Sequence, residues 1–269
     1  MFLIHMSELF GVDYVINKVV ATVDMKPSQE FIKYIAGGYL GDFFMQLSVI
    51  QENYIQTSKK GLLCITDIKQ DFRNSINKVY LDTYEIIKEQ EYIYEYQIYS
   101  NDGFDIDLSS WRKHPMLCKT NFATTYSLKY GISWGLHKWL NLPHNEQWKD
   151  VILINTVDYR SHGNIDLQNI KRKYPECSLV FISIFEEHYK HFLYTTPQHS
   201  NEVIYYCPNS LLDTAIAIHS CRLFIGVPSG LLSIAYSCHH KSITIPIHSN
   251  LENLISSNME FLNTNYTFD

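Results

Sequence analysis

The stretch LFIGVPSGLLSIA, residues 223–235, decides the fold class of this chain. Its apolar start belongs to a predicted strand over residues 222–226, the turn Val227–Gly230 follows, and the apolar residues after the turn fall at helical spacing. A strand whose positions are almost all apolar is buried on both faces, which is typical of a parallel sheet covered by helices. The stretch therefore predicts an α/β fold in which strands and helices alternate.

The same alternation runs through the whole second half of the chain. Apolar runs predict its strands at residues 151–156, 179–185, 203–206, 222–226 and 242–247. Residues at helical spacing predict helices at 167–174, after Ser210 and after Gly230. Asp213 follows Ser210 by three residues, so this pair is expected to form a capping box at the start of its helix. The pattern predicts a Rossmann-like half with a parallel sheet.

The first half contains one clear strand–helix–strand unit. An apolar run predicts a strand at residues 31–36, the segment Gly37–Asp42 turns into a helix, and residues 62–66 predict the next strand. Further elements are expected as a helix at 83–92, a strand at 94–99, a loop around 111–115 and weak helical patterning from 120 to 140. Residues 1–30 carry no regular pattern.

A break in the pattern separates the two halves. The residues Leu142-Pro143-His144-Asn145 stand just before the second half and are the expected linker. The chain has 269 residues, and single cores tend to split beyond about 250 residues. We therefore expect two Rossmann-like domains facing a cleft, formed by residues 1–145 and 146–269.

Composition and charge exclude several classes of protein. The chain is 46% apolar and 14% aromatic, which predicts an ordered globular fold, and its net charge of −6 argues against wrapping nucleic acid. Its six cysteines form no Cys-x-x-Cys pair, which indicates free thiols in a reducing compartment. The sequence shows neither a signal-peptide pattern nor 18 consecutive uncharged apolar residues. A soluble cytoplasmic protein without a transmembrane segment is expected.

Two junctions between a strand and a helix are the candidate binding sites. Helix N-termini at the carboxyl ends of parallel strands attract phosphate groups, because their first N–H groups have no partner in the helix. At the second junction, Ser229 and Gly230 form a turn that can cradle a diphosphate; the alternative is a plain serine N-cap. At the first junction, Asp42 is either a general base or a residue that caps its helix.

Other motifs favour no competing chemistry. The glycines at 37, 38 and 41 do not match the dinucleotide pattern G-x-G-x-x-G, and the context of Ser229 is not the G-x-S-x-G of hydrolases. The pairs His239-His240 and His188/His191 lack a metal-binding pattern, so no metal site is expected. Packing in the core is the expected role of the four tryptophans, Trp111, Trp134, Trp139 and Trp148.

Two segments together resemble the heptosyltransferase-like GT-B glycosyltransferases, which are also called glycosyltransferase family 9. The segments are GGYLGDFFMQL, residues 37–47, and LFIGVPSGLLSIA, residues 223–235. That family opens with a glycine-rich turn and a helix of the pattern G-D-x-x-x-x-L-P, and it ends with a strand followed by D-[ST]-G-x-x-H-L-A. The order and spacing agree over most of residues 31–248. The resemblance implies an acceptor-side domain at 1–145 and a nucleotide-sugar donor domain at 146–269.

The resemblance also implies roles for single residues. Asp42 matches the acidic residue that deprotonates the acceptor hydroxyl, beside the acceptor-side turn of Gly38 and Gly41. The turn at Ser229 and Gly230 matches the family's donor-diphosphate turn. Two further donor contacts are implied by position, namely Arg160 near the phosphates and Glu187 near the ribose. No metal and no cofactor beyond the nucleotide-sugar substrate are implied.

The chain departs from the family pattern at three positions. Pro228 stands where the family has aspartate, Ser233 where it has histidine, and Ser48 where it has proline. The expected function is an inverting, metal-independent transfer of a sugar from a nucleotide-diphosphate donor to a glycan or other acceptor hydroxyl. The alternatives are an inactive nucleotide-sugar or glycan-binding module, a nucleotide-sugar epimerase and a structural or interaction protein.

Overall fold

The computed structural model describes most of the chain from Glu30 onward. The described residues are 30–68, 72–117, 122–157, 165–196, 202–240, 242–244 and 259–261. Those from Phe31 onward belong to one compact unit. No helix among them is long and apolar enough to cross a membrane.

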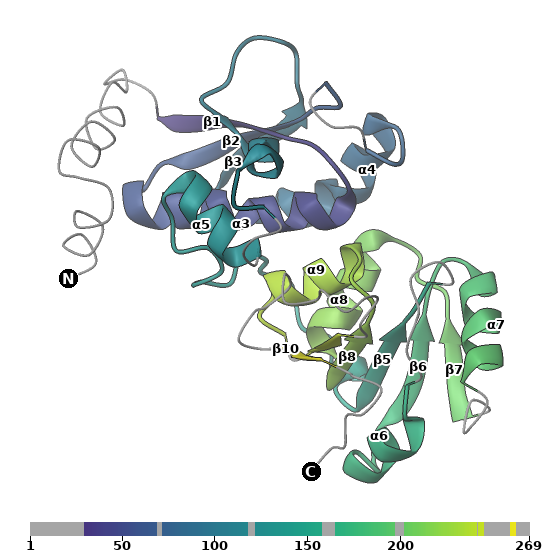
Figure 1. The fold of residues 1–269 in the computed structure, drawn as a ribbon. Coiled ribbons are helices and arrows are strands. Elements are labelled where there is room, and N and C mark those ends of the chain that lie inside the picture. Colours follow the sequence, from purple (N-terminus) through teal and green to yellow (C-terminus); the bar gives the residue numbers. More distant parts are fainter. Residues whose placement is uncertain are drawn as a thin grey trace, which may run out of the picture. The chain divides into compact units, whose positions relative to one another are not determined.

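The first sheet has four parallel strands. In spatial order they are β3 (Ile93–Ile98), β2 (Lys60–Ile65), β1 (Phe31–Ala36) and β4 (Ile106–Asp107). The helices that accompany this sheet are α3 (Leu40–Thr57), α4 (Ile76–Ile87), the 3₁₀ helix η1 (Leu108–Lys113) and α5 (Phe122–Tyr130) (Figure 1). The register pairs Phe31 with Lys60 and continues without interruption to Ala36 and Ile65. The predicted strand–helix–strand unit is therefore confirmed.

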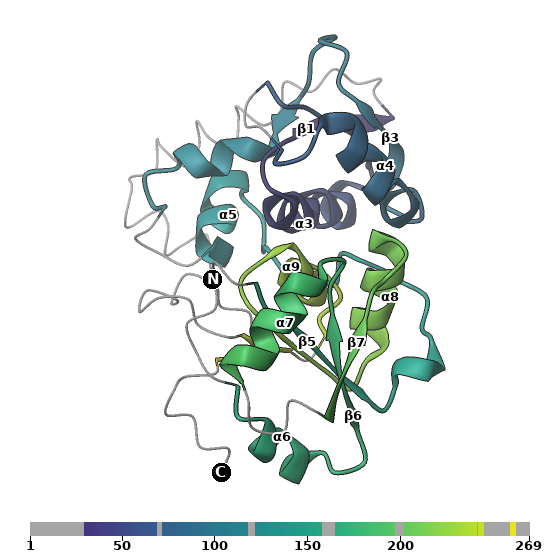
Figure 2. The same cartoon turned by 90° about the vertical axis from the view of Figure 1, so that its right-hand side faces the viewer.

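The second sheet has six strands, and each neighbouring pair is parallel. Its strands lie in the order β10 (Met259–Phe261), β9 (Ser242–Thr244), β8 (Leu223–Gly226), β5 (Val151–Asn155), β6 (Ser178–Ile182) and β7 (Val203–Tyr206). Its helices are the 3₁₀ helix η2 (Glu146–Trp148), α6 (Leu167–Lys173), α7 (Glu186–Thr195), α8 (Leu211–Ser220) and α9 (Gly230–Ser237) (Figure 2). The predicted parallel α/β half is confirmed.

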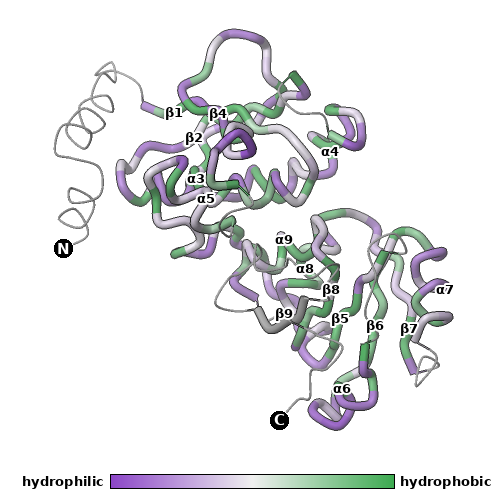
Figure 3. The backbone as a smooth tube through the Cα atoms, in the orientation of Figure 1, coloured by the Kyte–Doolittle hydropathy of each residue, from purple (hydrophilic) through white to green (hydrophobic). Residues whose placement is uncertain are grey.

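Apolar strands explain why this sheet is covered on both faces. All five residues of β5 and all four of β8 are buried, and these strands are mostly hydrophobic in Figure 3. One core cluster contains Leu153 and Phe224 of this sheet together with Phe43 and Leu47 of α3. A second cluster fills the other face with Ile152, Ile154 and Ile225, among others. The first of these clusters thus joins the two sheets in one core.

Each of the two sheets is built from one half of the chain. Strands β1 to β4 end before residue 108 and strands β5 to β10 begin at Val151, so each sheet comes from one of the two expected halves. Because the first core cluster draws on both halves, neither half is self-contained in its packing. The division into domains at residues 145 and 146 stays a prediction.

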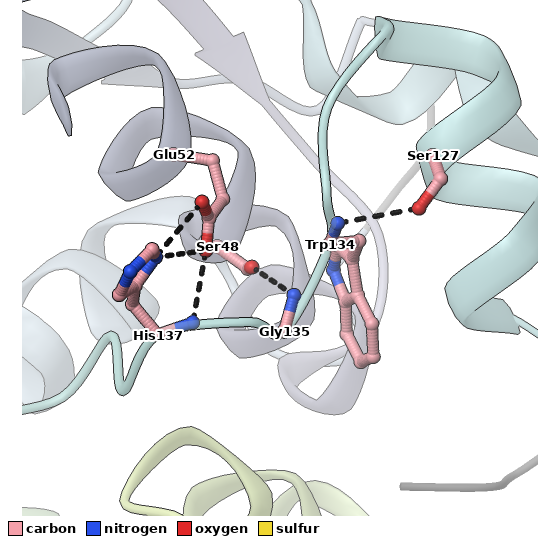
Figure 4. A network of polar contacts seen from close by, with 6 residues as sticks. All are labelled: Ser48, Glu52, Ser127, Trp134, Gly135 and His137. Carbon is pink, nitrogen blue, oxygen red and sulfur yellow. Dashed lines mark hydrogen bonds and ion pairs between the residues drawn. The ribbon is translucent and has the colours of Figure 1, made fainter. Parts of the chain in front are cut away.

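A connecting segment, residues 131–141, packs against α3 of the first half before the chain enters the second half. The polar network that holds it consists of Ser48, Glu52, Ser127, Trp134, Gly135 and His137 (Figure 4). Glu52 is only 2% exposed and accepts a hydrogen bond from the backbone N–H of His137 at 3.0 Å, while His137 Nδ1 lies 3.1 Å from both carboxylate oxygens. A carboxylate buried without such partners would be costly, so this network fixes the segment against α3.

The tryptophans are core residues, as expected. Each of the four is less than 9% exposed. Trp134 and Trp139 of the connecting segment donate their indole N–H groups to the carbonyls of Met45 and Phe44 in α3, at 3.0 and 2.7 Å. They therefore pack and anchor the connecting segment, which confirms the packing role.

Several element boundaries differ from the sequence prediction. The helix expected at 83–92 is α4, which begins at Ile76 because Ser75 caps it by accepting the N–H of Lys78 at 3.4 Å. The strand expected at 179–185 ends at Ile182, since the Ser183 hydroxyl accepts the N–H of Phe185 at 3.0 Å and turns the chain into α7.

Two further predictions were wrong in part. The loop expected around 111–115 is helical up to Lys113, because Asp107 caps η1 by accepting the N–H of Ser109 at 2.9 Å. The capping box of α8 is half formed: Ser210 Oγ accepts the N–H of Asp213 at 3.0 Å, but the Asp213 carboxylate accepts the N–H of Asn209 instead of Ser210. Strand β4 was not predicted, because two residues are too few for a pattern.

Candidate active site

The turn before α3 shapes the first half of the candidate site. Gly38 has a φ of 108°, a conformation that residues with a Cβ rarely adopt, so the glycine allows the chain to turn from β1 into α3. The Gln46 side chain donates to the Gly37 carbonyl at 2.9 Å and so stabilises the turn. As a result, Asp42 lies in the first turn of α3.

Two donors hold the Asp42 carboxylate. The Tyr39 backbone N–H donates to Asp42 Oδ2 at 3.3 Å, and the Arg112 guanidinium forms an ion pair with the same oxygen. The Asp42 side chain is 13% exposed. Asp42 therefore caps α3 through Oδ2, which is one of the two roles that the sequence predicts. Its other oxygen, Oδ1, has no hydrogen bond from a described residue.

Arg112 is itself held in place by aromatic side chains. Its guanidinium carbon lies 4.8 Å from the centroid of the Trp111 ring, and Trp111 stacks on Tyr126 with centroids 4.9 Å apart. Burial raises the pKa of Tyr126 well above its ordinary value; the Asp42 charge raises it further, whereas Arg112 lowers it. These three side chains surround Asp42 with a cation and a buried hydroxyl.

The turn before α9 forms the second half of the candidate site. Ser229 stands at the N-cap position of α9, but its side chain makes no capping hydrogen bond. Its Oγ is buried and finds no hydrogen-bond partner among the described residues. Ser229 therefore occupies the N-cap position without capping α9, and the first N–H groups of the helix have no side-chain acceptor among the described residues.

The two turns meet directly. A Cβ placed on Gly41 would lie 3.1 Å from Ser233 Oγ, 3.5 Å from the Ser229 carbonyl oxygen and 3.6 Å from the Gly230 nitrogen. A Cβ on Gly230 would lie 3.1 Å from a methyl group of Leu40. The two glycines thus permit the N-termini of α3 and α9 to approach closely. Both helix ends carry partial positive charge, so their meeting favours an anion between them.

Ser233 explains one departure from the family pattern. Its hydroxyl donates to the Ser229 carbonyl at 3.2 Å, and it is 6% exposed next to Gly41. A larger side chain such as histidine would have to displace neighbouring atoms at this buried position. The serine therefore replaces a projecting donor with a local contact that supports the turn.

Of the two other predicted donor contacts, the structure describes only Glu187. Glu187 is an exposed residue in the first turn of α7, after β6, and its neighbour Glu186 pairs with Lys190 at 3.2 Å. In the sheet, β6 and β8 both flank β5, so the loops after these three strands share one edge. Arg160, in the loop after β5, lies outside the described residues.

Metal ligands do not gather in the described part of the chain. No group of three or more His, Cys, Asp or Glu side chains is placed to hold a metal ion there. His188 hydrogen bonds to Ser183 Oγ at 3.3 Å, and burial lowers the pKa of both His239 and His240. Five cysteines, at 64, 177, 207, 221 and 238, are free thiols.

Arg112 is the site residue that the sequence pattern did not reveal. It lies 70 residues from Asp42 in sequence, in a stretch without helical or strand periodicity. The only local signal is the basic pair Arg112-Lys113 directly after Trp111. Such a pair is common on solvated surfaces, and only the fold brings its first member to the turn before α3.

By sequence, no protein-family model and no curated protein matches this chain. Solved structures match its fold. A glycosyl transferase of family 9 from Veillonella parvula is 12% identical with a TM-score of 0.56, and the match covers 86% of each chain. The E. coli heptosyltransferase WaaC, solved with ADP-2-deoxy-2-fluoro heptose, is 9% identical with a TM-score of 0.53, over 86% of this chain and 92% of WaaC.

A third solved structure is TibC, an iron-containing dodecameric glycosyltransferase from enterotoxigenic E. coli. It is 11% identical with a TM-score of 0.53, and the match covers 87% of this chain and 63% of TibC. At such low identities the three matches show a shared fold. They confirm the predicted α/β fold with two Rossmann-like sheets, as in GT-B glycosyltransferases.

Proposed function

We propose that this protein is a glycosyltransferase that moves a sugar from a nucleotide-diphosphate donor to an acceptor hydroxyl. The observation that carries the proposal is the contact between the N-termini of α3 and α9, which accompany different sheets. One of them bears the carboxylate of Asp42, and the other is the uncapped turn at Ser229 and Gly230. A base and an anion-binding turn placed side by side are what this transfer needs.

The proposed reaction is a single displacement. Asp42 Oδ1 takes the proton of the acceptor hydroxyl as that oxygen attacks the anomeric carbon of the donor. The bond from this carbon to the diphosphate oxygen breaks, and its electron pair leaves with the diphosphate. Because attack and departure occur on opposite faces of the sugar, the configuration at the anomeric carbon inverts.

Charge on the leaving diphosphate is stabilised by the α9 turn. In the part of the chain that the structure describes, the first N–H groups of α9 and the Ser229 hydroxyl have no side-chain partner, and the helix dipole adds partial positive charge. Arg160 is proposed to add a full charge, and Glu187 to bind the ribose hydroxyls at the same edge of the sheet. With these groups in place the transfer is proposed to need no metal.

The solved structures support the choice of substrate class. Two of them are described as glycosyltransferases by name, and WaaC was solved with an ADP-linked heptose analogue. We carry over to this chain only the class, a nucleoside diphosphate linked to a sugar. TibC contains iron, so metal independence is tested directly below.

The alternative with specific support is a binding module that retains the donor but not the reaction. Pro228 and Ser233 replace residues of the family pattern on the donor side, and Ser233 makes only a local contact. The second alternative is an epimerase on the same fold, which would use the nucleotide sugar as its substrate. The binding module predicts donor binding without a product, and the epimerase predicts a changed sugar on the donor.

The test is a panel of nucleotide-diphosphate sugars, assayed with and without a mixture of sugar acceptors in the presence of EDTA. The proposal predicts release of nucleoside diphosphate that depends on the acceptor, with an inverted linkage by NMR. Binding by calorimetry without release identifies the binding module. A changed sugar in the absence of acceptor identifies the epimerase, and restored turnover only after metal addition contradicts the metal-independent reaction.

A further inference from the structure

Asp42 and Arg112 form an ion pair with an unusual arrangement of donors. Both donors to the carboxylate, the Tyr39 N–H and the Arg112 guanidinium, use Oδ2. A surface ion pair that merely tied η1 to α3 would need no such selectivity. Here the second oxygen, Oδ1, is left without a hydrogen bond from any described residue.

The element that carries Arg112 is rigidly supported. Asp107 caps η1 at Ser109, and the Tyr130 hydroxyl donates to the Leu108 carbonyl at 2.7 Å. The guanidinium rests on the Trp111 ring, which stacks on Tyr126. Since both the backbone and the flat face of the guanidinium are fixed, the direction of its bond to Asp42 is fixed as well.

The surroundings of the pair hold buried polar atoms without partners. Seven side-chain atoms in the described part of the chain are buried without a hydrogen bond, and three of them are Arg112 Nε, Trp111 Nε1 and the Tyr126 hydroxyl. Such atoms destabilise the fold, so a cluster of them is expected where function requires it.

The charged and titratable groups around Asp42 are few. Arg112 approaches from η1 and Tyr126 from α5, and Arg73 lies over the Tyr39 ring at 5.4 Å. Helix α9 brings only hydroxyl groups and backbone N–H groups, because residues 230–237 include no charged residue. Arg112 is therefore a described side-chain cation that contacts the carboxylate directly.

We infer that Arg112 is a positioning residue for the catalytic base: it holds Asp42 through Oδ2, so that Oδ1 is the oxygen that takes the acceptor proton. The inference rests on the proposed function. It assigns a role to a residue that touches the base and not the reacting atoms. The competing explanation is a structural ion pair that stabilises the contact between η1 and α3.

The experiment compares Arg112→Gln with Lys113→Gln, a matched control that removes the neighbouring, exposed cation. Arg112→Gln is expected to lower kcat by ~10- to 100-fold, because a misplaced base reacts poorly, with little change in the donor KM. Lys113→Gln is expected to behave as the wild type.

A second variant, Arg112→Lys, keeps the charge but loses the flat, two-sided donor, so it is expected to restore kcat only in part while the donor KM stays unchanged. Thermal melts show whether each variant is folded. Equal kcat in Arg112→Gln and the wild type, or a lower melting temperature without a loss of kcat, overturns the inference while the proposed function stands. Wild-type protein without turnover on any donor overturns both.

Discussion

The N-termini of α8 and α9 look alike in sequence and differ in how their donors are used. Each follows a strand of the second sheet and has serine at the N-cap position, with nearly the same backbone: φ −154° and ψ 169° at Ser210, φ −156° and ψ 179° at Ser229. Ser210 Oγ accepts the N–H of Asp213, whereas Ser229 Oγ is buried without a partner among the described residues.

The difference separates a helix end whose donors are satisfied by the chain from a helix end that is available to the proposed ligand. At α8, Asp213 also accepts the Asn209 N–H and the Tyr206 hydroxyl, at 3.1 and 2.7 Å, so this end is satisfied by the chain itself. At α9, the corresponding third position is the apolar Leu232, and the first turn faces Gly41 of α3. A helix end left open in this way is a natural anion site.

The largest expected effect separates the two first-turn aspartates, Asp42 of α3 and Asp213 of α8. Asp42→Asn keeps an acceptor for the Tyr39 N–H but removes the base, so transfer is expected to fall about 10²- to 10⁴-fold. Asp213→Asn changes a capping contact and is expected to leave turnover unchanged. The measurement is initial rate with a saturating donor, and calorimetry checks that nucleoside diphosphate binding survives in both variants. Normal turnover of Asp42→Asn contradicts its role as base.

The next effect concerns the C-terminal ends of α8 and α9. His240, just after α9, lies with Nε2 3.3 Å from the Cys221 thiol that follows α8, and burial lowers the pKa of His240 to about 4. In the unfolded chain a histidine binds a proton near pH 6.5. The contribution of neutral, buried His240 to the free energy of unfolding is therefore fully present above that pH and is lost as the pH falls toward 4. The loss is on the order of 2–3 kcal/mol at most.

His240→Gln is therefore expected to reduce the loss of unfolding free energy between pH 7 and pH 5, measured by urea titration. His219 and His239, whose pKa values are also lowered by burial, act in the same direction and keep part of the dependence. A variant with the same pH dependence as the wild type shows that His240 is accessible to protons in the folded state.

A smaller effect distinguishes the two N-cap serines. Ser210→Ala is expected to lower the free energy of unfolding by ~1 kcal/mol, the usual loss for a serine cap, without changing the donor KM. Ser229→Ala removes a hydroxyl that caps nothing, so stability changes by less than about 0.5 kcal/mol. Urea unfolding and donor saturation curves on both variants test this contrast. Equal loss of stability in both means that Ser229 is an ordinary cap.

The smallest effect separates the two adjacent carboxylates of α7. Glu186 pairs with Lys190 on the surface, and both side chains are more than half exposed, so Glu186→Gln is expected to change little. Glu187→Gln is expected to raise the donor KM by a few-fold, on the order of one neutral hydrogen bond. Unchanged KM in both variants removes Glu187 from the site and leaves the rest of the proposal intact.

The fold could be predicted where burial shapes the sequence. Strands β5 and β8 are apolar throughout because both of their faces are covered, and the helical spacing in α3 and α9 marks the faces that pack. The start of α4 was missed because its capping serine, Ser75, lies ahead of the apolar pattern. Two-residue β4 and the short η1 leave no periodic signal.

The site could be predicted in part for the same reason. Glycine at 41 and 230 and serine at 229 stand at strand-to-helix turns, which the alternating pattern locates, and the fold brings these turns into contact. The partner of Asp42 could not be predicted, because Arg112 reaches it across 70 residues through an irregular segment. Whether Ser229 caps its helix depends on side-chain geometry, which the sequence leaves open.

The central claim is that the open N-terminus of α9 binds the donor diphosphate. Calorimetric titration of ADP, UDP and GDP, in the presence of EDTA, into the wild type, Ser229→Ala and Ser210→Ala tests it most directly. The account predicts that at least one of the three binds the wild type, that Ser229→Ala weakens this binding several-fold, and that Ser210→Ala leaves it unchanged. Absence of binding to the wild type, or equal weakening by both substitutions, would contradict the claim.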